Sequence, residues 1–400
     1  MRFLPGLLRK AIKNGRLTLL GPIGFEETFG TDDGSTPVTI RISKPSLDWK
    51  LPLNPELRFA ESYMDGDLEI VEGDVYDLLV LFYRNRKQFD LSPGQIFWRG
   101  VARRLKRLQQ HNSLSLSRTH VKHHYDLTDE LFDLFLDADK QYSCAYFPDG
   151  DETLEEAQAK KRRHIVRKLN LEDGQRVLDI GCGWGGLALE IAAAADVEVV
   201  GITLSENQAR IANERAEKAG VRDRVSFRIE DYRELGEKFD RIVSVGMLEH
   251  VGARHLREYF MAVRDALAPE GVALVHSIST KSPPGVTGPF IRKYIFPGGY
   301  SPALSEISAA IELTGLWVLD IEVWRKHYGY TIREWRKRFA ARRAEAVALY
   351  DERFARMWEF YLAATEGVFF YGSSNVLQIQ LGRERDGVPI SRDYLYREEL

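Results

Sequence analysis

The chain of 400 residues is poor in the features that mark secreted, membrane-spanning or nucleic-acid-binding proteins. It contains only two cysteines, Cys144 and Cys182, which are too few for a disulfide framework and suit a reducing compartment. No apolar run reaches the roughly 18–20 residues that a transmembrane helix requires. The formal net charge is −3, so any anionic partner must be met by local basic patches. We therefore expect a cytoplasmic protein with no spanning helix and no nucleic-acid partner.

The chain does contain enough apolar sequence for more than one domain. Hydrophobic residues make up 44% of it and charged residues 29%, which is typical of globular proteins. We expect residues 1–110 to form a separate lobe with a strand at 38–42, and residues 111–400 to form the main domain. Two stretches, Arg2–Leu20 and Phe97–Leu108, mix basic with apolar residues. Each is either a helix on an anionic membrane surface or a solvated helix whose apolar side packs on the protein.

From about residue 160, short apolar segments alternate with segments of helical periodicity. This alternation predicts a parallel, doubly wound sheet with right-handed crossovers. The expected strands are Arg176–Ile180, Val197–Ile202, Val225–Ile229, Phe239–Val245, Val272–His276, Trp317–Val323 and Val376–Leu381. The expected helices are 187–195, 206–219, 254–267 and one long helical segment at 333–365.

A glycine-rich turn follows the first of these strands and opens a helix, so main-chain N–H groups can approach a nucleotide-like ligand closely. The turn contains Gly181, Gly183, Gly185 and Gly186. Its spacing also fits the dinucleotide site of a dehydrogenase. Asp179 argues against that interpretation, because a carboxylate opposes a pyrophosphate and favours a ligand with an ammonium group. S-adenosylmethionine carries an ammonium and a sulfonium but no phosphate, so the sequence predicts a Rossmann-like methyltransferase.

The end of the second expected strand departs from the generic methyltransferase pattern. A generic member has an acid there that binds the ribose hydroxyls, whereas this chain reads Gly201-Ile202-Thr203-Leu204-Ser205. Another group must therefore bind the ribose.

Four further blocks resemble the cyclopropane fatty acid synthase family, which includes the mycolic acid cyclopropane synthases. They are His124-Tyr125-Asp126-Leu127 with Gln141–Phe147, Gly201–Gln208, Asp231-Tyr232-Arg233 with Ser244–Gly252, and Lys293–Gly299 with His327-Tyr328 and Trp335. The resemblance covers about residues 120–382, and the N-terminal lobe resembles that of longer bacterial members. It implies an α/β, class I S-adenosylmethionine methyltransferase fold with a seven-stranded, mostly parallel sheet and a smaller N-terminal α+β lobe.

The resemblance also implies how the cofactor is held. The matching residues are Thr203, Leu204 and Gln208 at the ribose and methionine ends, Tyr142 and Ser143 over the cofactor, Gly181 and Gly183 at the floor of the loop, and Asp231 near the adenine. We add Asp179 to this set for a different reason, because its carboxylate favours a ligand with an ammonium group.

The family reaction is methylene transfer to a cis double bond of an acyl chain in phospholipid. The alkene attacks the sulfonium methyl, and the resulting carbocation closes to a cyclopropane ring when a base removes a proton, which requires a water-free pocket. The resemblance implies a bicarbonate ion as this base and no metal. The residues that match its site are Cys144, Glu249, His276, Tyr328 and, through its main chain, Ile278. Because an anion repels a carboxylate, either a proton is shared between Glu249 and the ion or Glu249 orients His276 as a donor.

Two departures from the family pattern bear on the site. Thr128-Asp129 stands where many members have Gly-Asn, and Thr365 stands where some members have a cysteine. Three different functions also stay open. The same carbocation can give a methyl- or methylene-branched acyl chain in place of a ring. The chain also fits a methyltransferase for a small soluble substrate, or a non-catalytic protein that binds lipid or cofactor.

The resemblance finally implies the partners. We expect S-adenosylmethionine and bicarbonate as cofactors, unsaturated phospholipid as substrate, and peripheral contact with the anionic inner face of the membrane through one of the two basic stretches. Family members are often dimers, so a homodimer is one expectation for the assembly.

Overall fold

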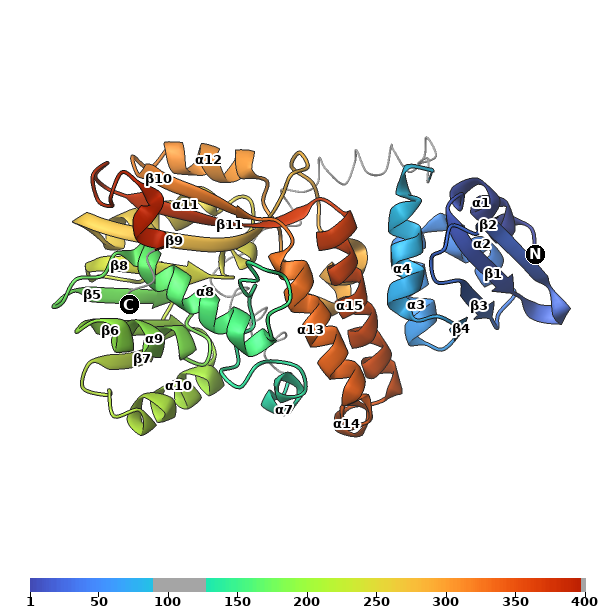
Figure 1. Ribbon diagram of the computed structural model, residues 1–400, viewed down its shortest axis with the longest axis horizontal. Coiled ribbons are helices and arrows are strands. Elements are labelled where there is room, and N and C mark those ends of the chain that lie inside the picture. The colour runs from blue at the N-terminus through green and yellow to red at the C-terminus, as the bar shows by residue number, and fades with distance from the viewer. Residues whose placement is uncertain (89–126, 397–400) are drawn as a thin grey trace. The chain divides into compact units, whose positions relative to one another are not determined.

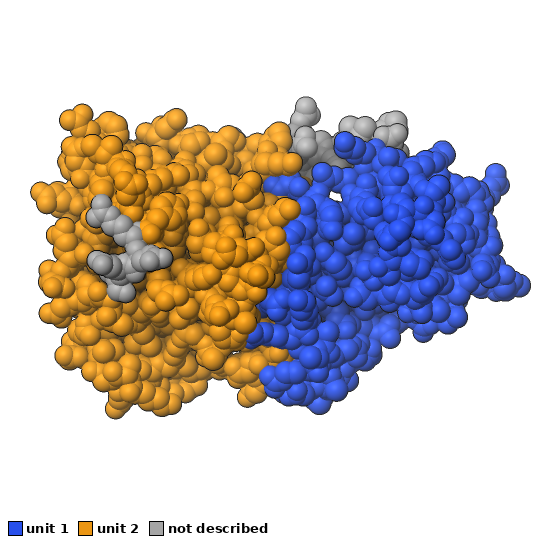
Figure 2. Space-filling view, viewed as in Figure 1, with its two compact units in different colours: residues 1–105, 287–297, 332–373 blue, residues 106–286, 298–331, 374–400 orange. Residues whose placement is uncertain are grey.

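The computed structural model describes residues 1–88 and 127–396, which fall into two compact units (Figure 2). Unit 1 comprises residues 1–105, 287–297 and 332–373, and unit 2 comprises residues 106–286, 298–331 and 374–400. The N-terminal stretch is thus grouped with two later segments of the chain. A functional division at residue 110 stays a prediction. The second basic stretch, Phe97–Leu108, lies outside the described residues.

Unit 2 is built on a seven-stranded sheet in the order β10-β11-β9-β8-β5-β6-β7 (Figure 1). Strands β5 to β9 pair in parallel, whereas β11 is antiparallel to both of its neighbours. The strands are β5 (Arg176–Ile180), β6 (Glu198–Thr203), β7 (Val225–Ile229), β8 (Phe239–Val245), β9 (Leu267–Thr280), β10 (Trp317–Trp324) and β11 (Ser374–Gly382). The expected mostly parallel, doubly wound α/β sheet is confirmed.

Helices cover both faces of this sheet. They are α11 (Leu256–Ala266) and α12 (Leu304–Glu312) on one face, and α8 (Leu154–Leu169), α9 (Gly186–Ala194) and α10 (Glu206–Lys218) on the other. Successive side chains of a strand point to opposite faces, so a strand buried on both faces must be apolar at consecutive positions. In β8, for example, Ile242 packs in the first core and Val243 in the second.

The predicted boundaries are correct for β5, β7 and β8, and β9 is longer than expected at both ends. The expected helical segment at 333–365 is helical, but it is not one continuous helix. The structure has α13 (His327–Ala341), α14 (Arg343–Leu349) and α15 (Glu352–Tyr371) instead. The chain leaves the helical conformation at Tyr350, and Asp351 begins the next helix by accepting a hydrogen bond from Phe354 N at 2.6 Å.

Unit 1 contains a four-stranded sheet in the order β2-β1-β3-β4. Its N-terminal elements are α1 (Phe3–Ala11), β1 (Gly15–Leu20), β2 (Glu26–Thr31), β3 (Val38–Ile42), α2 (Leu47–Leu53), α3 (Pro55–Met64), β4 (Leu68–Glu72) and α4 (Val75–Arg84). Arg2–Leu20 is therefore a helix followed by a strand, and not one amphipathic segment. Leu4, Leu8 and Leu17 are buried in the core of this unit, so the apolar face of α1 is already covered.

Specific polar contacts join the N-terminal elements of unit 1 to α15. The Tyr63 hydroxyl donates to Glu359 Oε2 at 3.2 Å, and the Tyr83 hydroxyl donates to the main-chain oxygen of Ala364 at 3.0 Å. A Cβ at Gly367 would lie only 2.3 Å from the Tyr83 ring, so α15 approaches α4 closely at this point. Among the described residues, no helix is long and apolar enough to cross a bilayer.

We predict that Gly185→Ala is more destabilising than Gly183→Ala. Both residues have positive φ, at 83° and 54°, so each substitution costs roughly 1–2 kcal/mol of backbone strain. A Cβ at Gly185 would also lie 2.7 Å from the Phe227 ring, whereas a Cβ at Gly183 meets nothing within 4 Å. Overpacking should add roughly 1–3 kcal/mol at Gly185. Denaturant unfolding of the two variants measures the difference, and equal losses would contradict this account of the turn.

Candidate active site

The glycine turn lies in unit 2 at the carboxyl end of β5, the edge at which open α/β sheets bind ligands. The N–H groups of Gly181 and Cys182 both donate to the Ile202 oxygen, at 2.9 and 3.1 Å, which fixes the turn against β6. Gly183 faces open space. A ligand can therefore approach the main chain of the turn at Gly183.

Asp179 is buried beneath this turn with an incomplete set of hydrogen bonds. The residue is 2% exposed, and its Oδ2 atom has no hydrogen-bond partner among the described residues. Burial raises the pKa of Asp179 to about 7, an effect that the positive charge of Lys161 partly opposes. An orphaned buried carboxylate oxygen fits the ammonium group of S-adenosylmethionine, so the residues present are compatible with that cofactor.

The acid-free segment after β6 is held by its own side chains. The Thr203 hydroxyl donates to Gln208 Oε1 at 2.8 Å and accepts from Ser205 N at 3.2 Å. Ser205 in turn caps α10 by accepting from Gln208 N at 3.3 Å. Leu204 lies between these residues and is partly exposed. The segment is therefore rigid, with both Thr203 and Gln208 buried.

Residues 141–147 pack against α8. Lys161 Nζ donates to Gln141 Oε1 at 2.6 Å and to the Ser143 hydroxyl at 2.9 Å. Gln158 Nε2 donates to the main-chain oxygens of Gln141 and Ser143, at 3.2 and 3.1 Å. Tyr142, next to Ser143, is partly exposed. Four hydrogen bonds from two side chains of one helix thus hold this strap, residues 141–147.

Glu249 follows β8 and is bound to the neighbouring strand. Its Oε1 atom accepts from Ile278 N at 2.5 Å, whereas its Oε2 atom is buried and has no hydrogen-bond partner among the described residues. Burial raises the pKa of Glu249 to about 7, although the bond from Ile278 opposes this. The carboxyl group can therefore hold or release a proton near neutral pH.

His276 lies on β9, two residues before Ile278, and is 2% exposed. Gln378 Nε2 lies 3.1 Å from His276 Nδ1, and in this orientation of the amide it donates to that nitrogen, which places the ring proton on Nε2. Nε2 has no partner among the described residues. Burial, reinforced by the charges of Lys161 and Lys168, holds the pKa of His276 well below its usual value. His276 is therefore a neutral ring with a free N–H donor.

Cys144 and Tyr328 are brought to the same region by contacts between the strap and the start of α13. Ala145 N donates to the Thr331 hydroxyl at 2.9 Å, and Phe147 N donates to His327 Nδ1 at 2.9 Å. Cys144 is 1% exposed, and burial raises the pKa of its thiol far above neutrality. Its thiol is therefore protonated at neutral pH and is not poised to act as a nucleophile.

Comparison with known proteins assigns the chain to a family. Residues 112–379 match the family model described as mycolic acid cyclopropane synthetase, and residues 23–92 match a domain of unknown function. The chain is 39% identical over 366 residues to a cyclopropane-fatty-acyl-phospholipid synthase of Escherichia coli, over 90% of this chain and 92% of that protein. This chain belongs to the mycolic acid cyclopropane synthetase family. It is also 36% identical over 378 residues to a probable fatty acid methyltransferase of Pseudomonas putida, over 92% of this chain and 93% of that protein.

Solved structures place the fold in the same family. The cyclopropane synthase MmaA2 from Mycobacterium tuberculosis is 33% identical and superimposes with a TM-score of 0.63, over 66% of this chain and 97% of that one. The cyclopropane synthase CmaA1, solved with S-adenosylhomocysteine and CTAB, is 32% identical with a TM-score of 0.62, over 66% of this chain and 97% of that one. The expected class I methyltransferase fold is confirmed, and this family member is an S-adenosylmethionine-dependent methyltransferase.

Not every predicted residue of this methyltransferase is free to act as the resemblance implies. Both carboxylate oxygens of Asp231 accept from the Arg233 guanidinium, at 2.8 and 2.7 Å, so an adenine contact there has to compete with an ion pair. The N–H of Ile278 is already bound to Glu249. His276 is oriented by Gln378 and not by Glu249. The roles assigned to the other site residues stay predictions.

The sequence interpretation missed Gln158 and Lys161. A signal was present, because α8 carries a stripe of buried residues at helical spacing and polar residues interrupt it. The stripe consists of Leu154, Ala157, Gln158, Lys161, His164, Ile165, Lys168 and Leu169. Polar side chains within an apolar stripe are buried, so they must find partners or ligands.

The structure also shows what Asp129 does where it differs from the family pattern. Its two carboxylate oxygens accept from Trp184 Nε1 at 3.0 Å and from Asn207 Nδ2 at 2.7 Å. Trp184 belongs to the glycine turn and Asn207 to the first turn of α10. Asp129 therefore ties the short helix α7 (Asp129–Asp133) to the cofactor-binding edge of this methyltransferase.

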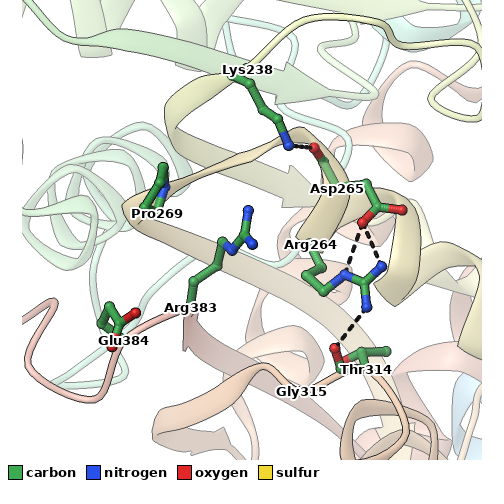
Figure 3. Close-up of a pocket in the computed structure, with 8 residues that line it drawn as sticks. All are labelled: Lys238, Arg264, Asp265, Pro269, Thr314, Gly315, Arg383 and Glu384. Carbon is green, nitrogen blue, oxygen red and sulfur yellow. Dashed lines mark hydrogen bonds and ion pairs between the residues drawn. The ribbon is translucent and has the colours of Figure 1, made fainter.

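A separate pocket lies at the opposite edge of the sheet, where β8 and β9 begin (Figure 3). Its volume is about 450 Å³, and three of its lining residues are Lys238, Arg264 and Arg383. Each of these cations donates to a main-chain oxygen, namely those of Asp265, Thr314 and Leu267. They cap the ends of helices and strands, and none of the site residues predicted from sequence lines this pocket.

We predict that Asp179→Asn stabilises the ligand-free enzyme while weakening binding of S-adenosylhomocysteine. The pKa of Asp179 rises from its ordinary value of about 4 to about 7 on folding, so ionisation opposes folding as the pH rises through this window. The variant should be more stable than the wild type by roughly 1–3 kcal/mol at pH 8, with less advantage toward pH 4. Exposed Asp223→Asn is the control. An unchanged affinity for S-adenosylhomocysteine would remove Asp179 from the cofactor site.

Proposed function

We propose that this enzyme transfers a methylene group from S-adenosylmethionine to the cis double bond of an unsaturated acyl chain in phospholipid, giving a cyclopropane fatty acid. The observation that carries the proposal is that two buried atoms near the ends of β8 and β9, Glu249 Oε2 and His276 Nε2, have no hydrogen-bond partner in the part of the chain that the structure describes. Such atoms are costly unless a ligand or a proton completes their bonds. The names of the relatives, a cyclopropane-fatty-acyl-phospholipid synthase and a fatty acid methyltransferase, support the lipid substrate.

Bound S-adenosylmethionine would supply an electrophilic methyl group. Asp179 would hold its ammonium, the open side of Gly183 would admit it to the glycine turn, and the segment Thr203–Gln208 would bind the ribose and methionine ends. Tyr142 and Ser143 would close over it. These residues would orient the methyl group and, together with the bound ligand, would exclude water, which would otherwise trap a carbocation formed on the acyl chain.

Ring closure requires a base within reach of the departing proton. Glu249 Oε2 can take part, because the pKa of this carboxyl is raised to about 7. Glu249 Oε2 and the His276 Nε2–H group, neither of which has a partner among the described residues, would be the contacts of a bicarbonate ion, which would supply a mobile base. His276 is oriented by Gln378, so a proton shared with Glu249 is the better of the two ways to relieve the repulsion between the ion and the carboxylate.

The direct test uses methyl-labelled S-adenosylmethionine and vesicles of cis-unsaturated phospholipid, followed by mass spectrometry of the fatty acids. We expect label in a saturated product one methylene heavier than the substrate. A labelled product that takes up hydrogen under mild hydrogenation would show a methylene branch instead of a ring. No label in lipid would contradict the proposed function.

We predict that Glu249→Gln retains binding of S-adenosylhomocysteine but loses about 100-fold or more in turnover, because an amide cannot take up a proton. In the wild type, turnover should rise as the pH increases through about 7, since the pKa of Glu249 lies there and its ionised form is the base. Glu258→Gln, an exposed glutamate of α11, is the control. A near-normal rate in Glu249→Gln would exclude Glu249 from the chemistry.

We also propose peripheral docking on an anionic membrane, in the cytoplasm, through exposed apolar residues of unit 1. The apolar face of α1 is used by the core, so it is not available to lipid. Phe3, Trp49 and Leu53 are at least half exposed, and Ile23 is fully exposed. Ile23 has a φ of 60°, which is rare for a β-branched residue and holds its side chain away from the core. A homodimer stays a prediction.

Ile23→Asn should weaken binding to anionic phospholipid vesicles several-fold in a sedimentation assay. Asparagine tolerates the positive φ and removes only the apolar side chain, so the fold should be retained. Ile390 in unit 2 is equally exposed, and Ile390→Asn should bind as the wild type does. Equal binding by all three proteins would show that Ile23 does not contact the membrane.

A further inference from the structure

Lys161 is a buried lysine of unit 2 without a carboxylate partner. It is 1% exposed, and no carboxylate among the described residues lies within salt-bridge distance of its Nζ atom. Its two hydrogen bonds go to uncharged acceptors, Gln141 Oε1 and the Ser143 hydroxyl. Burying an ammonium group in this way is costly, so a purely structural role is a poor explanation for it.

Lys168, two turns further along the same helix, shows what a structural lysine looks like here. It is equally buried, but Glu322 Oε2 lies 2.5 Å from its Nζ atom and Asp320 Oδ2 lies 3.8 Å away. Its charge is therefore neutralised within the protein. Lys161 has no such salt bridge among the described residues, and the nearby carboxylates of Asp137 and Asp139 act on its charge only from a longer distance.

The surroundings of Lys161 indicate which ligand this is. Its charge lowers the pKa of Asp179, so the two groups lie within electrostatic range of each other. Both are buried, and Asp179 Oδ2 has no hydrogen-bond partner among the described residues. Burial lowers the pKa of Lys161 to about 8, while Asp137 and Asp139 oppose this shift, so the ammonium keeps its charge at neutral pH. Lys161 and Asp179 therefore place one positively charged and one negatively charged group at the cofactor-binding edge.

We propose that Lys161, acting through the Ser143 hydroxyl, is the positioning residue that selects the carboxylate of the cofactor's amino-acid end, opposite Asp179, which selects its ammonium. The inference rests on the proposed function in that the ligand is S-adenosylmethionine. The amino-acid end is a zwitterion, and two buried groups of opposite charge match it. The same lysine holds the strap residues Gln141 and Ser143 to α8. Loss of its charge should therefore weaken binding of the amino-acid end of the ligand and leave binding of the adenosine unchanged.

The test compares two ligands by calorimetry, each with the full chain and without lipid. S-adenosylhomocysteine carries the amino-acid end, whereas 5′-methylthioadenosine has the same adenosine and sulfur without it. Lys161→Met should weaken binding of S-adenosylhomocysteine by about tenfold or more and change binding of methylthioadenosine by less than about twofold. Ser143→Ala should show the same selectivity, because it removes the hydroxyl between the lysine and the ligand.

Lys168→Met is the matched control, and its ratio of the two affinities should equal that of the wild type even if the protein is less stable. Lys161→Arg keeps the positive charge, so its ratio of the two affinities should lie closer to that of the wild type than the ratio of Lys161→Met does. Equal weakening of both ligands by Lys161→Met, or no weakening of either, would overturn the role of Lys161. A wild type that binds neither ligand would instead overturn the proposed function itself, so the two failures are distinguishable.

Discussion

At the carboxyl ends of β5, β8 and β9, the chain buries Asp179, Glu249 and His276, and the residues that the structure describes do not complete their hydrogen bonds. Desolvation then controls the chemistry of the site, because it raises the pKa of both carboxyl groups to about 7 and keeps the imidazole neutral. The parallel sheet makes this arrangement tolerable, since apolar cores on both faces stabilise the fold while its edge stays polar. Each incomplete group marks a place where a ligand or a proton is expected.

Much of the sheet could be predicted from sequence, because local rules determine it. Strands buried on both faces must be apolar at consecutive positions, so Arg176–Ile180 and Phe239–Val245 were correctly bounded, and the alternation of apolar and polar residues gave the bounds of the edge strand Val225–Ile229. The glycine turn was also recognisable, since the positive φ at Gly181 and Gly183 favours glycine at those positions. The chemistry of Asp179 followed from its place beside that turn, and the family followed from blocks of residues in order along the chain.

The rest depends on contacts between residues far apart in sequence. Two hydrogen bonds form only once β8, β9 and β11 are paired, one from Ile278 N to Glu249 and one from Gln378 to His276. As a result, His276 is oriented by Gln378 and not by Glu249. Lys161 stood in an apolar stripe of α8, but its partners in the strap are set by tertiary packing. The grouping of residues 287–297 and 332–373 with the N-terminal stretch likewise has no local signal.

The central claim is that a desolvated Glu249 exchanges its proton near neutral pH, and carbon-13 NMR of the protein labelled at its glutamate carboxyl groups measures this most directly. The Glu249→Gln variant assigns the resonance by its absence. We expect one carboxyl resonance, missing in that variant, to titrate with a midpoint near pH 7, as burial without a partner for Oε2 requires. A midpoint below about pH 5 for Glu249 would contradict the claim, because the carboxylate would then be solvated or fully paired.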